Sequence, residues 1–325
     1  MRIGITGASG FIGYHLCGEL AAYGHEVVAI DSLRPVYASK WSLMRTTKLA
    51  SELAISVLNL DIVDTDISSL RRIFSKCDLM VHLAAWPGVR QSMENPDAYA
   101  RENVSAFSKI SNACQDLQIP LFFASSSSVY GDAGTQGPTR EIEANGLGLK
   151  SYYALTKWIN EVESLTSQRL FGQPALALRF FTVYGSWGRP DMAYWKFAER
   201  ILSQQSIPLY GPTGGMRSFT HVADAVSIVR KLIENPLSLK LSAVNVANTL
   251  PKSTLEFVSD LAKSLDEPLP ILDIVPRPTA DAEKTWASTE LLASVIEIPK
   301  AQKSEIQMYD LAAFFRNIKE LGYLN

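Results

Sequence analysis

The chain has 325 residues, 47% of them hydrophobic, which is enough to bury a large core and excludes an intrinsically disordered protein. Because the formal net charge is −2 and dense Lys/Arg runs are absent, nucleic acid and anionic membrane surfaces are not expected as partners. The three cysteines, Cys17, Cys77 and Cys114, lie far apart and form no C-x-x-C pair, so we predict neither a disulfide framework nor a metal site. No apolar run reaches the roughly 18 residues of a membrane span, and we expect a cytoplasmic protein.

Short apolar runs alternate with longer amphipathic segments through the first half of the chain. We predict strands at 3–6, 25–30, 53–58, 79–84, 121–125 and 175–181. Helices are predicted after Gly10, Asn103, Tyr152 and His221, the last because apolar positions recur at helical spacing from 222 to 233. This alternation is typical of a doubly wound α/β fold built on a parallel sheet.

The second half of the chain differs from the first in its distribution of glycine and proline. Glycine and proline cluster at 185–190, 208–215 and 276–278, which indicates loops and short elements of a second lobe. A strand at 243–246 is expected to return to the main sheet. We therefore predict a main domain at 1–182, to which 222–248 returns, and a smaller C-terminal lobe formed by 183–221 and 249–325. Residues 290–325 show helical periodicity and no site.

Three glycines follow the first predicted strand at the start of the first predicted helix. Gly7, Gly10 and Gly13 let the backbone approach a pyrophosphate, whose charge would rest on the free amides of the helix start. A plain tight turn gives the same letters, but the strand and helix around them favour a dinucleotide. Asp31 ends the second strand, where a carboxylate accepts both hydroxyls of the adenosine ribose and repels a 2′-phosphate. NAD is therefore predicted, and Arg34 leaves NADP as an alternative.

The third predicted strand is followed by Asp61 and Ile62. Their place in the chain suits contact with the adenine, although an ordinary loop aspartate would look the same.

A serine, a tyrosine and a lysine form the candidate catalytic group. Tyr153 and Lys157 are four residues apart and share one helix face, and Ser126 lies at the carboxyl end of a predicted strand, where doubly wound sheets bind ligands. The lysine and a nicotinamide cation both favour the phenolate, and lowering a tyrosine pKa from about 10 to about 7 needs roughly 4 kcal/mol. A chance Tyr–Lys pair and a serine-rich turn are the alternatives.

Four motifs in order resemble the extended short-chain dehydrogenase/reductase family: TGASGFIG at 6–13, HLAA at 82–85, SSSSVYG at 125–131 and YALTK at 153–157. The resemblance implies a Rossmann domain with tightly held NAD, and a nucleotide-diphospho-sugar between this domain and the C-terminal lobe. It also implies a Ser126–Tyr153–Lys157 catalytic set and a homodimer formed by helices near 104–117 and 152–170. The implied NAD contacts are Gly7, Gly10, Phe11, Ile12, Gly13, Asp31, Asp61, Ile62, Leu83, Ala84, Ala85, Asn103, Tyr153 and Lys157.

The reaction is suggested by the residue before V-Y-G. Dehydratases and decarboxylases of this family carry an acidic residue there, whereas this chain carries Ser128. An epimerase is therefore expected. Tyr153 would take the proton of the sugar 4-hydroxyl while Ser126 bonds the same oxygen and hydride passes to the nicotinamide. The 4-keto sugar would turn over and receive hydride on its opposite face, which regenerates NAD.

The segment 179–192, with 88–90 and 94–97, resembles the UDP-glucuronate 4-epimerases more closely than the UDP-galactose 4-epimerases, which tend to carry asparagine in place of Thr182. The implied substrate contacts are Arg90, Ser127, Ser128, Thr182, Arg189, Arg217, Arg277 and Asp281. Within this set, the resemblance assigns the sugar carboxylate to Ser127, Ser128, Thr182 and Arg189, and it assigns the UDP diphosphate to Arg217. Arg277 and Asp281 would close over the nucleotide.

Arg189 has a chemical reason to hold the carboxylate. A 4-keto uronic acid is a β-keto acid, and we hypothesise that a bidentate Arg189 keeps its carboxylate out of alignment with the carbonyl π system and so prevents decarboxylation. A surface arginine in a Gly-Pro loop is the alternative. Residues 217–224 depart from the family pattern R-D-F-T-Y-V-D-D, and Ala280 replaces a family glycine, so the nucleotide base is left open.

Two other functions remain compatible with the sequence. A 4-epimerase of neutral UDP-sugars, UDP-glucose or UDP-N-acetylglucosamine, would keep every catalytic residue and lose only the carboxylate pocket. A non-catalytic NAD-binding regulatory protein would use the same fold without the chemistry.

Overall fold

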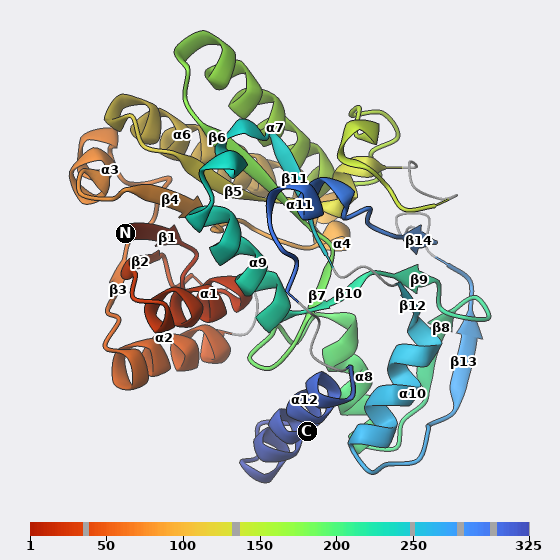
Figure 1. The fold of residues 1–325 in the computed structure, drawn as a ribbon. Coiled ribbons are helices and arrows are strands. Elements are labelled where there is room, and N and C mark those ends of the chain that lie inside the picture. Colours follow the sequence, from red (N-terminus) through yellow and green to blue (C-terminus); the bar gives the residue numbers. More distant parts are fainter. Residues whose placement is uncertain (35–38, 132–136, 248–250, 278–282, 300–303, 325) are drawn as a thin grey trace.

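The computed structural model describes the chain except residues 35–38, 132–136, 248–250, 278–282, 300–303 and 325 (Figure 1). Its centre is a seven-stranded parallel sheet in the order β11-β6-β5-β4-β1-β2-β3. The strands are β1 (Arg2–Thr6), β2 (Glu26–Asp31), β3 (Val57–Asn59), β4 (Leu79–His82), β5 (Leu121–Ser126), β6 (Ala175–Phe180) and β11 (Ala243–Val246). The strand β1 pairs with β2 on one side and with β4 on the other, so the strand order runs outward from β1 in both directions. The predicted doubly wound α/β fold is therefore confirmed.

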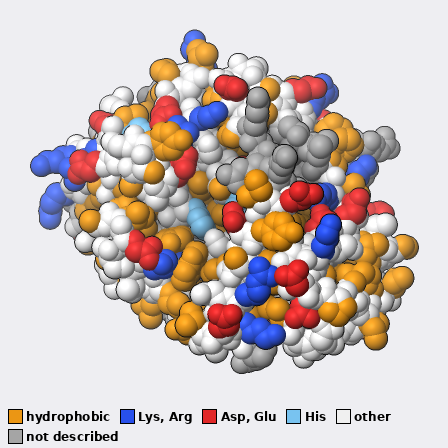
Figure 2. Space-filling model, turned by 60° about the horizontal axis from the view of Figure 1, so that its bottom comes forward, with side chains coloured by type: hydrophobic (Ala, Val, Ile, Leu, Met, Phe, Trp, Pro, Cys, Tyr) orange, Lys and Arg blue, Asp and Glu red, His pale blue; other side chains and the backbone are white. Residues whose placement is uncertain are grey.

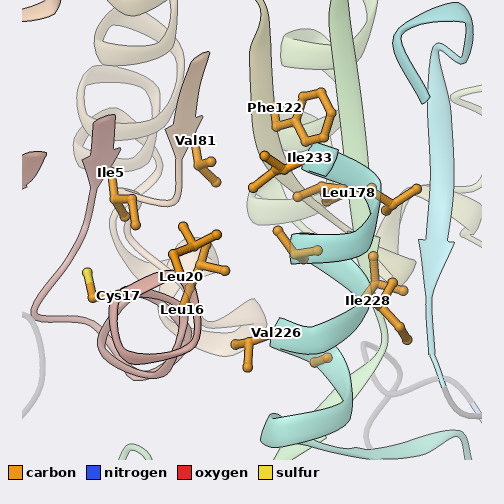
Figure 3. Close-up of a cluster of buried hydrophobic side chains, with 14 of the residues drawn as sticks. Ile5, Leu16, Cys17, Leu20, Val81, Phe122, Leu178, Val226, Ile228 and Ile233 are labelled. Atoms are coloured by element: carbon orange, nitrogen blue, oxygen red, sulfur yellow. The ribbon is translucent and has the colours of Figure 1, made fainter. Parts of the chain in front are cut away.

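Helices cover both faces of this sheet. One face carries α1 (Phe11–Ala22) and α9 (Val222–Glu234), and the other carries α3 (Ile67–Phe74), α6 (Ala106–Leu117) and α7 (Tyr152–Phe171). Figure 3 shows how the first face is filled: Ile5 and Val81 of the strands point toward Leu16 and Leu20 of α1, and Leu178 lies beside Ile233 of α9. The buried faces of these helices, rather than intrinsic propensity, hold them on the sheet.

The helix α2 (Ser39–Leu53) was not predicted, and it corrects the third strand. The prediction began that strand at residue 53, but α2 continues through Leu53 and β3 begins only at Val57. Lys48 and Glu52 form an ion pair four residues apart, which supports the last turn of the helix.

A smaller lobe is built mainly from residues beyond β6. It contains α8 (Ala193–Leu202), α10 (Thr254–Ser264), α12 (Ser304–Glu320) and the parallel pair β8 (Ile207–Tyr210) and β13 (Leu272–Val275), at the lower right of Figure 1. An aromatic core joins these helices to α2 through Trp41, Trp195 and Phe315. The helix α11 (Glu290–Val295) packs instead against β11, with Leu292 in the main core. Part of the segment 249–325 thus lies on the main sheet.

The remaining elements are short. They are α4 (Val89–Glu94), α5 (Pro96–Tyr99), the π-helix η1 (Ala100–Ser105), the 3₁₀ turns η2 (Ser127–Tyr130), η3 (Glu141–Glu143) and η4 (Pro236–Lys240), and the strands β7 (Thr182–Tyr184), β9 (Met216–Arg217), β10 (Phe219–His221), β12 (Lys252–Ser253) and β14 (Lys284–Thr285). On the face shown in Figure 2, acidic and basic side chains are interspersed rather than gathered by sign, in keeping with the small net charge.

Candidate active site

The turn between β1 and α1 leaves no room for side chains. Gly7 has a φ of +73°, and an added Cβ would lie 2.7 Å from the Ala84 nitrogen; at Gly13 it would lie 2.1 Å from the Gly7 oxygen. Gly10 is the N-cap of α1 and gives it no side-chain hydrogen bond. The first amides of α1 therefore remain available for an anion, which the positive end of the helix dipole also favours.

Asp31 lies beside this turn at the end of β2. Its carboxylate accepts the backbone N–H groups of Ser9 and Leu33, both at 2.9 Å. Burial raises the pKa of Asp31, and the two amides and the Arg45 cation oppose that rise. The carboxylate is thus held at the place where the first and second strands end, next to the glycine turn.

Arg34 is engaged by carboxylates. Its guanidinium forms ion pairs with Asp61 at 2.8 Å, Asp64 at 2.6 Å and Glu102 at 3.6 Å. A 2′-phosphate would have to compete with these three acids for the Arg34 guanidinium, and the Asp31 carboxylate would repel it. This arrangement favours NAD over the NADP alternative that Arg34 left open.

One cavity of about 340 Å³ joins the nucleotide end to the candidate catalytic group. Most of the predicted cofactor and catalytic residues line it, together with Arg189: Gly7, Gly10, Phe11, Ile12, Gly13, Asp31, Asp61, Ile62, Leu83, Ala84, Ala85, Ser126, Tyr153 and Lys157. Asn103, which was also predicted, is not among the residues that line the cavity. Its side-chain amide pairs with the backbone of Trp86, at 2.7 and 2.9 Å, and donates to Thr156 at 3.1 Å, which ties the wall to α7.

Tyr153 and Lys157 project from the first turns of α7. The Ser151 hydroxyl caps this helix by accepting the Ala154 N–H at 3.1 Å, and the Lys157 Nζ lies 5.8 Å from the centre of the Tyr153 ring. Ser126 ends β5, hydrogen-bonds the Tyr153 side chain, and accepts the Ser128 N–H at 3.2 Å. The predicted trio is therefore brought together at one end of the cavity.

Burial dominates the electrostatics of this pair. It raises the pKa of Tyr153, and the nearby Arg189 cation and the Ser126 hydrogen bond oppose the rise only in part. It also lowers the pKa of Lys157 to about 8. The protein's own groups thus raise the tyrosine pKa, because burial outweighs the nearby cation and the hydrogen bond. The lowering expected from Lys157 together with a nicotinamide cation stays a prediction.

Of the residues expected at the sugar carboxylate, Arg189 lines the cavity with Tyr153, whereas Ser127, Ser128 and Thr182 are not among its lining residues. Arg189 is held by Asp191 through two bonds, Nε to Oδ1 at 2.9 Å and Nη2 to Oδ2 at 2.7 Å. Ser127 and Ser128 form the turn η2, and the Ser128 hydroxyl is buried with no hydrogen-bond partner among the described residues. Thr182 begins β7, opposite Phe219 of β10.

Three predicted arginines converge on the loop after β8, outside this cavity. Arg90 donates to the Tyr210 hydroxyl at 3.1 Å, and Arg277 donates to the Tyr210 carbonyl at 2.8 Å. A Cβ added at Gly215 would lie 2.9 Å from Arg277 Nη1 and 3.0 Å from Arg217 Nη1. These cations suit a diphosphate. Asp281 lies outside the described residues.

Sequence analysis missed the contribution of α2 to the cavity. Ser42 and Arg45 line it, and the buried Arg45 donates to the Ser9 carbonyl at 2.6 Å. The signal was present, because Trp41, Arg45 and Leu49 recur at a spacing of four and all three are buried.

Within the described ranges, no cluster of His, Cys, Asp and Glu side chains has the arrangement of a metal site. No helix in the described part of the chain combines the length and hydropathy that crossing a bilayer requires.

Comparison with known proteins assigns the family. The NAD dependent epimerase/dehydratase family matches residues 3–247. Protein CapI of Staphylococcus aureus is 34% identical over 312 residues, 89% of this chain and 91% of CapI. The probable UDP-glucuronate 4-epimerase of Rhizobium meliloti (strain 1021) is 31% identical over 313 residues, 91% of each protein. A crystal structure of UDP-glucuronic acid 4-epimerase from Bacillus cereus, in complex with UDP-glucuronic acid and NAD, has a TM-score of 0.87 and 25% identity, covering 98% of this chain and 100% of that one.

These matches confirm the resemblance to the extended short-chain dehydrogenases/reductases, the prediction of an isomerase and the prediction of NAD as cofactor. The chain belongs to the NAD dependent epimerase/dehydratase family.

Proposed function

We propose that this protein is a NAD-dependent 4-epimerase that interconverts UDP-glucuronate and UDP-galacturonate. The observation that carries the proposal is that Ser126, Tyr153, Lys157 and Arg189 line one cavity with the glycine turn and Asp31. That cavity brings a dinucleotide site, a proton-transfer group and a cation for a carboxylate together. The similarity to UDP-glucuronate 4-epimerases supports the same substrate class.

The residues present fit the cofactor. Gly7, Gly10 and Gly13 would let the pyrophosphate approach the start of α1, and Asp31 would accept the adenosine ribose hydroxyls. When bound, NAD supplies the hydride acceptor for oxidation at carbon 4 and the donor for reduction.

Tyr153 moves the proton. Its phenol would take the 4-hydroxyl proton, and Ser126 would hydrogen-bond the same oxygen as it becomes a carbonyl. The Lys157 ammonium, held 5.8 Å from the ring centre in the same buried site, would stabilise the phenolate in that step. Tyr153 would return the proton as an acid once the keto sugar has turned and been reduced on its other face.

The sugar carboxylate is assigned to Arg189, Ser127, Ser128 and Thr182. Asp191 fixes the Arg189 guanidinium through two bonds, so the cation is oriented before the substrate arrives. The buried Ser128 hydroxyl requires a partner, which a carboxylate oxygen would supply. Held in this way, the carboxylate would lie out of alignment with the 4-keto group and would not leave as carbon dioxide.

The UDP moiety would occupy the arginine loop, with Arg217 on the diphosphate and Arg277 and Asp281 over the nucleotide. Arg90 would contact the substrate from α4. The convergence of Arg90, Arg217 and Arg277 around Tyr210 and Gly215 supports this assignment.

We also propose a cytoplasmic homodimer. On α7, the apolar residues Tyr152, Leu155, Ile159 and Val162 recur at three- and four-residue spacing and are exposed. A continuous exposed apolar stripe of this kind suits burial against a second copy of the same helix.

Anomeric proton NMR tests the reaction. Purified protein with NAD should convert UDP-glucuronate to UDP-galacturonate, and Tyr153→Phe should lower the rate by about 10³-fold or more. Turnover of UDP-glucose alone would refute the uronate assignment in favour of a neutral sugar, and a UDP-xylose product would indicate decarboxylation. If Tyr153→Phe left the protein's activity intact, the non-catalytic alternative would stand.

A further inference from the structure

Arg45 is a buried cation without a carboxylate partner. It is 5% exposed, and no Asp or Glu in the described part of the chain lies within ion-pair distance of it. Its acceptors are three backbone carbonyls: Nε donates to Ser9 at 2.6 Å, and Nη1 donates to Trp187 at 2.9 Å and Gly188 at 3.4 Å. The Asp31 carboxylate is near enough to favour the charged form of Arg45, but the hydrogen-bond partners of the guanidinium are all neutral. A buried charge whose hydrogen bonds all go to neutral groups is costly and gains from a further anion.

The position of Arg45 indicates which anion would come. Arg45 lines the same cavity as Asp31 and Gly10. It donates to the carbonyl of Ser9, the residue before Gly10, and it feels the charge of Asp31, so it lies close to the start of α1. Its third nitrogen, Nη2, makes no hydrogen bond within the described ranges. Burial lowers the pKa of Arg45 to about 10, which leaves the guanidinium charged at neutral pH.

The guanidinium is also held rigidly. Its bonds to the Trp187 and Gly188 carbonyls fasten it to the loop before Arg189, and Trp187 itself adopts a left-handed φ of 58° that this loop maintains. A cation fixed from two sides loses little side-chain entropy when it binds a ligand.

We propose that Arg45 is a pyrophosphate-binding residue that supplies NAD with a charged donor facing the glycine turn. The amides of α1 would bind one side of the diphosphate and the Arg45 guanidinium another. The inference concerns the cofactor and does not depend on the sugar substrate proposed above.

Binding measurements without catalysis test the proposal. Titration calorimetry would compare ADP-ribose, which carries the pyrophosphate, with adenosine, which lacks it, on wild type and on Arg45→Met. We expect Arg45→Met to bind ADP-ribose about 10- to 100-fold more weakly and adenosine within about twofold of wild type. Arg45→Lys, which keeps the charge, should lie between wild type and Arg45→Met. Lys40→Met is the matched control, because it removes an exposed cation of the same helix that contacts Trp41 and Tyr323 and does not line the cavity, so it should change neither affinity.

Two results would overturn the proposal: an equal loss of adenosine and ADP-ribose binding, which indicates a purely structural role, or unchanged ADP-ribose binding. If Arg45→Met does not fold, Arg45→Gln and Arg45→Lys carry the same comparison, since both keep a donor toward the Ser9 carbonyl. A failure of UDP-glucuronate turnover would leave these affinities unaffected, so the two proposals fail separately.

Discussion

The ion pair between Glu161 of α7 and Arg179 of β6 connects the catalytic helix to the sheet. Both residues are 4% exposed, and the pair is bidentate, with Nε to Oε1 at 3.0 Å and Nη2 to Oε2 at 2.7 Å. Glu161 also accepts the hydroxyl of Ser125, the residue before Ser126. Removing Glu161 would therefore disturb both the helix that carries Tyr153 and the strand end that carries Ser126.

The size of the effect follows from what Arg179 would lose. Its Nη1 would keep the Tyr130 hydroxyl at 3.0 Å and the Glu141 carbonyl at 2.7 Å, but Nε and Nη2 would remain buried without acceptors. Leaving such a charge uncompensated costs about 3–5 kcal/mol, and we expect Glu161→Ala to lower the free energy of unfolding by that amount. Glu161→Gln keeps the shape of the side chain but turns an amide donor toward the Arg179 cation, so most of the loss in the free energy of unfolding should remain.

Urea unfolding would measure the stability, and the NMR assay would measure the kinetics. A displacement of about 1 Å between Ser126 and Tyr153 should lower kcat about 10- to 100-fold with KM nearly unchanged. Glu163→Gln is the control on the same helix, because among the described residues the Glu163 carboxylate accepts a hydrogen bond from the Ser108 hydroxyl alone, and it should cost within about 1 kcal/mol. If Glu161→Gln cost no more than this control, the ion pair would not hold α7 to the sheet.

Three further outcomes are expected. Burial lowers the pKa of Lys157 to about 8, so between about pH 8 and 10.5 the unfolded chain binds more protons than the folded one and stability rises with pH. Lys157→Met should therefore unfold at higher urea than wild type at pH 7, with the difference shrinking toward pH 10; an unchanged difference would contradict this sign. Asp31→Ser removes the carboxylate that repels a 2′-phosphate, so it should improve the affinity for NADP relative to NAD about tenfold in fluorescence titrations. If Arg34 then binds the 2′-phosphate, adding Arg34→Ala should cancel this gain. Ile159→Glu should convert a dimer to a monomer in light scattering, whereas the equally apolar, exposed Ile274→Glu on β13 should not.

The features that sequence analysis located well depend on local chemistry. The glycine turn follows from a strand that ends one residue before Gly7 and a helix that begins at Phe11, and these signals lie within a dozen residues. The Tyr153–Lys157 spacing places both side chains on one helix face in any fold. For such groups, the order of elements along the chain was enough to place them at the carboxyl edge of the sheet.

The features that it missed depend on contacts between distant segments. Arg45 receives its role from carbonyls 36 and 142 residues away, and no pattern within α2 reveals those partners. The pairing of Arg34 with three acids likewise required the positions of η1 and of the loop after β3. The raised pKa of Tyr153 was missed for the same reason, because its burial is a property of the assembled site.

The sugar end of the cavity restricts how a uronate can be distinguished from a neutral sugar. Arg189 and Asp191 together carry no net charge, so this pair exerts little attraction on a carboxylate at a distance. If the substrate is a uronate, as proposed, selectivity would then come from short-range bonds, in which the oriented guanidinium and the buried Ser128 hydroxyl would meet carboxylate oxygens. Because Asp191 already pairs with Arg189, the group that a neutral sugar would leave unpaired is the Ser128 hydroxyl, at a cost of about 1–3 kcal/mol, which corresponds to roughly a 5- to 150-fold difference in kcat/KM. The preference for UDP-glucuronate should therefore be sensitive to the hydroxyl of Ser128 and nearly insensitive to ionic strength, whereas long-range attraction by a cationic pocket would show the opposite pattern.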